Sequence, residues 1–257
     1  MVVLGILCLL QPSSARAQGA DRKELMKQAR AAYSNLKDRG MGEFKANLTP
    51  NWEVMLKDQL GADPKANEAT LKRLREIRFS MTYDAEGAVK VTHTEPPAGN
   101  EQQAAGYKQI FGGMAQTVSG FFATWTAFMP VPPLPEVDGE YKIEEKEDHY
   151  RLAYKEGEAD VVTTLSKDFA VRELKVSTKE FESVLKPSFK KTPKGLLLVG
   201  YEATYEGPGN STQFKAEIEN QEAAGYPLPS KLSFKGTFNK GPIAMEIAFT
   251  EYEVKKR

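Results

Sequence analysis

The chain has 257 residues, with 35 Lys or Arg and 35 Asp or Glu, so its formal net charge is zero. A phosphate backbone requires a strongly basic surface, and the sequence therefore predicts no nucleic-acid partner. The length suits one large β-rich domain or two small ones. We expect a single domain over residues 18–257.

Residues 1–17 have the pattern of a cleavable export signal. Val2 to Leu10 is an uncharged apolar run, and Ala15-Arg16-Ala17 is a small-x-small cleavage motif. The run is too short to span a bilayer. The sequence therefore predicts cleavage after Ala17 and a periplasmic location. No Lys or Arg precedes the apolar run, which leaves an upstream start or a weak signal as alternatives.

Cys8 is the only cysteine and lies inside this signal. Leu7 precedes it where a lipoprotein signal needs a small residue, so lipidation is disfavoured. The mature chain is then predicted to have no disulfide, no Cys-ligated metal and no Cys nucleophile. A chain of this size can fold on its core alone.

The first half of the chain alternates helical and strand periodicity. A capping-box spacing at Asp21 and Glu24 begins an amphipathic helix that Gly40 ends. A strand is predicted next, over 41–48. A helix is then expected from Thr49-Pro50 to Gly61, and another over 65–76. A hairpin follows over 77–93, because the apolar period changes to two.

The second half, from about Gly139, is a succession of strands separated by turns. Beyond the first hairpins, strands are predicted at 171–176, 196–205, 212–219, 231–238 and 243–254. Their apolar and polar residues alternate, and a slip between Phe249 and Tyr252 predicts a β-bulge. The expected fold is α+β, a large curved antiparallel sheet (half-barrel) with helices on or in its concave face.

A segment from Gln109 to Pro135 contains no charged residue. Its apolar residues recur at helical spacing, and Asn100 with Gln103 can cap the start. Three interpretations stand open: a core helix, a helix that lines an apolar ligand cavity, and a transmembrane span weakened by three glycines. The predicted ligand-binding residues are Ile110, Phe111, Met114, Val118, Phe121, Phe122, Trp125 and Phe128 of this segment, with Phe234, Met245 and Ile247 of the C-terminal strands.

The sequence contains no recognisable catalytic or metal-binding motif, so no catalytic residue, metal or cofactor is predicted. His93 and His149 are the only histidines, and no second ligand stands at metal spacing from either. A hydrolase with converging carboxylates, and with Trp52 against a sugar, stays an alternative. The basic run from Lys186 to Lys194 is interpreted as a proline-marked surface loop, or else as a contact with anionic headgroups at a membrane surface.

The element order resembles the LolA/LolB-type lipoprotein carriers. The resemblance rests on the exported N-terminal helix, the Gly-Glu-Phe-Lys-Ala strand at Gly42–Ala46, and the long meander that follows. It implies a periplasmic half-barrel whose concave face holds acyl chains beneath a helical lid. The expected function is non-catalytic binding of a lipid or lipoprotein acyl chain. The alternative is an envelope scaffold or adaptor with a fully packed core.

Overall fold

The structure is a computed structural model that describes residues 14–96, 99–239 and 241–257, and in these residues a twelve-stranded antiparallel sheet is combined with four helices. The helices are α1 (Ser14–Ala31), α2 (Trp52–Met55), α3 (Pro64–Arg75) and α4 (Glu101–Thr126). The strands are β1 (Met41–Pro50), β2 (Phe79–Tyr83), β3 (Val89–His93), β4 (Tyr141–Glu145), β5 (His149–Glu156), β6 (Ala159–Ser166), β7 (Val171–Ser177), β8 (Glu182–Thr192), β9 (Gly195–Gly207), β10 (Asn210–Ala223), β11 (Tyr226–Phe238) and β12 (Gly241–Lys256).

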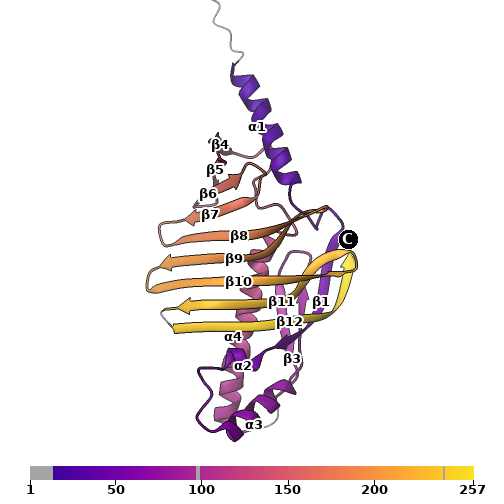
Figure 1. The fold of residues 1–257 in the computed structure, drawn as a ribbon, viewed down its shortest axis with the longest axis vertical. Coiled ribbons are helices and arrows are strands. Elements are labelled where there is room, and N and C mark those ends of the chain that lie inside the picture. Colours follow the sequence, from indigo (N-terminus) through magenta and orange to yellow (C-terminus); the bar gives the residue numbers. More distant parts are fainter. Residues whose placement is uncertain (1–13, 97–98, 240) are drawn as a thin grey trace, which may run out of the picture.

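The sheet is open, with the strand order β3-β2-β1-β12-β11-β10-β9-β8-β7-β6-β5-β4. The last strand of the chain thus pairs with the first, and all other neighbouring strands are consecutive in the chain. β1 and β2 are joined through α2 and α3. Figure 1 shows α4 behind the long strands β8–β12, with β1 and β3 curving round beside it. The predicted α+β class, with a curved antiparallel sheet, is confirmed.

The apolar side of α4 packs against the strands at one end of the sheet. The ring centroid of Phe122 lies 5.9 Å from Phe44 on β1, 6.0 Å from Tyr83 on β2 and 5.7 Å from Phe249 on β12. Trp125 meets the Tyr83 ring edge-on, at 5.8 Å. All these side chains are buried. We call the side of the sheet that carries α4 the inner face.

The segments that follow α1 and α4 pack over the inner face of β6–β9. The Tyr33 hydroxyl donates a hydrogen bond to the Phe169 carbonyl (2.9 Å) and accepts one from the Val171 amide (3.0 Å). The Tyr33 ring meets Phe189 of β8 edge-on, at 5.7 Å. The Leu36 amide bonds to the Met129 carbonyl, just after α4. The segments after α1 and after α4 therefore close this part of the core together.

The first predicted helix is wrong at its C-terminal end. It was expected to continue to Gly40, but α1 ends at Ala31. The Leu196 amide of β9 donates to the Ala32 carbonyl at 2.8 Å, so the backbone leaves the helix to meet the sheet. α1 also begins at Ser14, before the predicted cleavage site. The rest of the predicted signal, residues 1–13, lies outside the described residues.

The helix predicted from Thr49-Pro50 is also corrected. Pro50 is the last residue of β1, opposite Ile247 of β12. The helix start lies two residues later than predicted, because Asn51 is the cap: its side chain accepts a hydrogen bond from the Val54 amide. The resulting helix α2 is only four residues long.

The proline-marked loop predicted at Lys186–Lys194 is wrong, since most of it belongs to strand β8. Pro187 has no amide hydrogen to donate, which normally excludes it from a central strand. β7 pairs with β8 only as far as Leu185, so Pro187 faces a partner strand, β9, on one side only. This local edge lets the strand continue through the proline.

Several local predictions are confirmed. The hairpin strands β2 and β3 and the helix α3 lie where expected. The Asn100 side chain caps α4 by accepting from the Gln103 amide at 2.9 Å. Between the pairs Lys45↔Glu253 and Asn47↔Thr250, β12 contains one extra residue, which is the predicted bulge. No helix in the described parts of the chain is long and apolar enough to cross a membrane.

Gly195→Ala is expected to lower the free energy of unfolding by about 2–4 kcal/mol. Gly195 has φ of +103°, and an added Cβ would lie 2.7 Å from the Tyr33 carbonyl carbon. Gly157→Ala is the matched control, because Gly157 also has positive φ (+59°) but open space around it. Urea unfolding of both variants should show a clearly smaller loss for Gly157; equal losses would contradict the close approach.

Candidate functional site

The predicted ligand-binding residues of α4, and Phe128 just after its C-terminal end, form packed core. Phe111, Met114, Val118, Phe121, Phe122, Trp125 and Phe128 are each 5% exposed or less, and Ile110 is half-buried. Their neighbours are the aromatic side chains of β1, β2 and β12. This side of α4 is thus occupied by the protein's own sheet.

The three predicted residues on the C-terminal strands divide into two environments. Ile247 is fully buried and pairs with Leu232, which is also fully buried. Phe234 and Met245 are opposite one another on β11 and β12 and are only half-buried. They belong to a section of the inner face that α4 does not cover.

This section, which we call the open face, crosses six strands. Leu174, Leu185, Ala203, Phe214, Gly236 and Ile243 are successive cross-strand partners in one row from β7 to β12. The open face is defined as the half-buried residues Leu174, Leu185, Phe214, Phe234, Ile243 and Met245. The rings of Phe214 and Phe234 lie 4.4 Å apart. The result is a continuous apolar surface.

Exposure falls along the open face toward α4. At its outer end, Tyr205 is 37% exposed and Phe238 is 52% exposed. Phe214 and Phe234 come next and are half-buried, and Leu232 beyond them has no exposed surface. The strands that carry this gradient extend past α4 toward the hairpin turns in Figure 1. An apolar chain lying along it would pass from solvent to the edge of the core.

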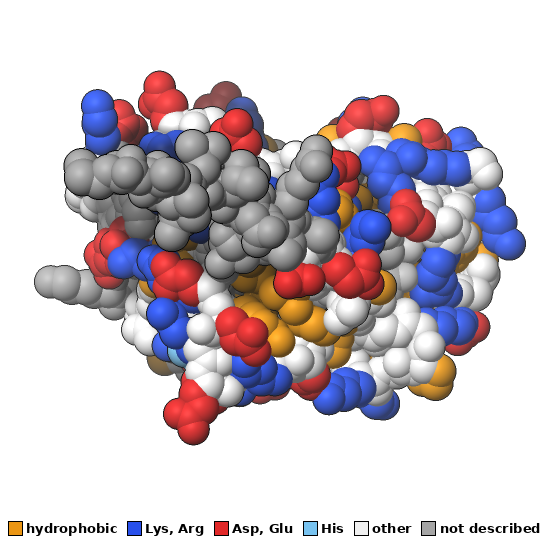
Figure 2. Space-filling model, turned by 90° about the horizontal axis from the view of Figure 1, so that it is seen from above, with side chains coloured by type: hydrophobic (Ala, Val, Ile, Leu, Met, Phe, Trp, Pro, Cys, Tyr) orange, Lys and Arg blue, Asp and Glu red, His pale blue; other side chains and the backbone are white. Residues whose placement is uncertain are grey.

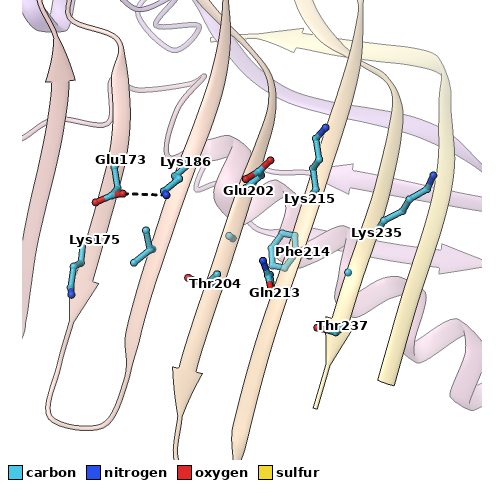
Figure 3. A pocket seen from close by; sticks show the side chains of 13 residues that line it. Glu173, Lys175, Lys186, Glu202, Thr204, Gln213, Phe214, Lys215, Lys235 and Thr237 are labelled. Carbon is cyan, nitrogen blue, oxygen red and sulfur yellow. Dashed lines mark ion pairs between the residues drawn. The ribbon is translucent and has the colours of Figure 1, made fainter. Parts of the chain in front are cut away.

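The outer face of the same strands is charged. A groove of about 650 Å³ runs over β7–β11 there (Figure 3). Across its floor the register pairs Lys186 with Glu202, Glu202 with Lys215 and Lys215 with Lys235. Lys186 also pairs with Glu173 at 3.6 Å. Exposed ion pairs of this kind contribute little to stability, so the ladder is a solvated face.

Charges of both signs are interspersed on the surface seen in Figure 2, with hydrophobic side chains gathered near its centre.

The residues considered for hydrolysis lie apart. His93 is on the edge strand β3 with its ring 4.7 Å from Phe111, and His149 on β5 contacts Asp148 at 2.7 Å. In the sheet order, β3 and β5 are near opposite ends. Trp52 is 2% exposed, so its ring is core and not a sugar platform. Within the described residues, no three His, Cys, Asp or Glu side chains form a metal-binding group.

Buried phenols make the fold sensitive to alkali. Burial raises the pKa of Tyr201 to about 12, and raises the pKa of Tyr33, Tyr83 and Tyr252 as well. The unfolded chain loses these protons near pH 10, while the folded chain keeps them. Their contribution to stability is therefore complete below about pH 10 and is lost as the pH rises through the folded values.

The free energy of unfolding should fall steeply above about pH 10, by on the order of 1 kcal/mol per pH unit for each such phenol. Tyr201→Phe removes one ionisable group and should make the fall shallower. Denaturant titrations at a series of alkaline pH values measure this slope. An unchanged slope in Tyr201→Phe would contradict the burial of that hydroxyl.

Part of the site has no clear sequence signal. The alternation of apolar and polar residues identified Phe214 and Phe234 as lying on one face of the sheet. It could not show which part of that face α4 packs against. Leu185 was missed because β8 was read as a loop.

Comparison of this chain with models of protein families, with curated proteins and with solved structures finds no match in any of the three.

Proposed function

We propose that the protein binds a lipid or the acyl chain of a lipoprotein, without catalysis, on the open face of its half-barrel. The observation that carries the proposal is the row of half-buried apolar side chains from Leu174 to Ile243, left uncovered by α4. A contiguous apolar surface that the fold leaves only partly buried is typical of an interaction site.

The chemistry of this surface suits an acyl chain. Each buried CH₂ contributes about 0.8 kcal/mol, so a long chain needs no strong polar contact. The open face offers aromatic rings and Met245, a flexible side chain that adapts to an irregular ligand. The site therefore lies beside α4, on Phe214, Phe234 and Met245, and not beneath the helix.

The predicted export signal and the resemblance to the LolA/LolB-type carriers support the same proposal. An exported half-barrel that carries acyl chains would meet its ligand in the periplasm. The element order of this chain, with an N-terminal helix before a long meander, is compatible with that role.

Extraction of the purified protein with organic solvent, followed by mass spectrometry, tests the proposal. Co-purified lipid, or stoichiometric uptake of an added fatty acid, is the expected result. A ligand-free protein that also ignores added fatty acid and lysophospholipid would contradict it.

An envelope scaffold or adaptor is the second candidate. It is favoured by the complete burial of the α4 aromatic side chains, which leaves no room for a ligand beneath the helix. In that case the open face would dock a protein. Stoichiometric binding of a fatty acid, lost on changing the open face, distinguishes the two.

A further inference from the structure

Three aromatic side chains lie at neighbouring hairpin ends along one rim of the sheet. Phe181 precedes β8, Tyr205 is near the end of β9 and Phe238 is the last residue of β11. Phe181 and Tyr205 stack with their centroids 5.5 Å apart. Tyr205 and Phe238 are both cross-strand partners of Thr212. We call these three residues the rim cluster.

The three residues of the rim cluster lie at strand ends that are on the same side of the sheet. The β7–β8 and β9–β10 turns and the adjoining ends of β11 and β12 all lie at the left of the sheet in Figure 1. Tyr205 on β9 and Phe238 on β11 are separated by one strand, which is a distance of roughly 10 Å. The two exposed side chains therefore form a short row. Single exposed apolar residues are normal, but a row at projecting turns is not.

We propose that the rim cluster docks the protein onto the surface of a lipid bilayer. This inference rests on the proposed function, since the rim is the exposed end of the open face. A Tyr side chain favours the membrane interface, where its ring meets the acyl region and its hydroxyl stays in water, and a Phe ring adds apolar area that the acyl region can bury. A docked rim would place the open face next to the acyl chains that it binds.

The charges around the rim indicate how the bilayer is recognised. Lys179 and Glu180 stand together in the β7–β8 turn, and the Glu182 carboxylate pairs with Lys175 at 2.6 Å. Both signs are present, so the rim has no polybasic attraction for anionic headgroups. Binding should therefore depend on insertion of the rings and be nearly independent of salt.

A bilayer fits the rim better than a second copy of the chain. Tyr205 and Phe238 each have a paired strand on both sides, so neither ring stands on a free strand edge. The free edge nearest the rim is the segment Gly241–Glu246 of β12, which β1 does not reach. A row of rings on projecting turns matches a soft apolar surface.

Sedimentation with phosphatidylcholine vesicles, alone and mixed with phosphatidylglycerol, tests the proposal at low and high salt. The unchanged protein should bind both vesicle types, with little effect of salt. The double variant Tyr205→Ser/Phe238→Ser should partition at least roughly tenfold less, since each ring contributes about three- to tenfold. Val131→Ser is the matched control, because Val131 is 38% exposed but lies outside the rim; its partitioning should not change.

Three outcomes would overturn the inference: equal partitioning of the double variant, binding that requires phosphatidylglycerol and is abolished by salt, or a concentration-dependent dimer that the double variant loses. Binding of a soluble fluorescent fatty acid is measured in parallel, without vesicles. The rim variant should retain it. If the rim variant loses vesicle binding but the unchanged protein takes up no fatty acid, the proposed function fails and the membrane contact stands.

Discussion

Phe122→Ala is expected to lower the free energy of unfolding by about 3–5 kcal/mol, the range for removing a large buried aromatic side chain. Phe122 is fully buried and contacts rings from three strands, as well as Trp125 of its own helix at 5.6 Å. Its removal would leave a cavity between α4 and the sheet. Denaturant unfolding followed by circular dichroism measures the change.

Gly120→Ala is the control in the same helix, with the opposite expected sign. A Cβ at Gly120 would have open space around it, and alanine is favoured over glycine inside a helix. This variant should gain about 0.5–1 kcal/mol. If Phe122→Ala cost less than about 1 kcal/mol, against the usual range for such sites, α4 would not be the core helix described here.

The double variant Phe214→Ser/Phe234→Ser is expected to weaken binding of a fluorescent fatty acid by about 100-fold. The two rings lie 4.4 Å apart at the centre of the open face, and both would lose their contact with an acyl chain. Fluorescence titration without vesicles measures the affinity. Circular dichroism checks that the variant keeps its sheet.

The matched control is Lys215→Ser/Lys235→Ser. These residues are on the same two strands, directly opposite one another, but on the outer face. The control should bind fatty acid as the unchanged protein does. Equal losses in the two double variants would mean that the affinity does not depend on the open face.

Sequence periodicity predicted most of the sheet because alternation reports directly which side of a strand is buried. It placed Phe214, Ala216 and Ile218 on one face, and the structure confirms this. The bulge near Glu251 was also predictable, since an extra residue disrupts the alternation.

Tertiary contacts account for the failures. Pro187 was read as a loop residue because the sequence cannot show that β7 stops pairing at Leu185. The end of α1 depends on the Ala32 carbonyl meeting β9, more than 160 residues later in the chain. The open face could not be predicted for the same reason. Tertiary packing, and not the local sequence pattern, determines how much of the inner face α4 covers.

Packing does not explain the glycines of α4. Gly112, Gly113 and Gly120 all have open space where a Cβ would stand. Alanine at each would be compatible with the helix, and nothing in the surrounding contacts requires glycine.

Photolabelling with a diazirine-bearing fatty acid, mapped by mass spectrometry, tests the open face most directly. If acyl chains lie on this surface, the label should be found on β9–β12, at or beside Phe214, Phe234 and Met245, and an excess of unlabelled fatty acid should suppress it. Label concentrated on the outer-face lysines, or spread evenly over the chain, would contradict a binding site beside α4.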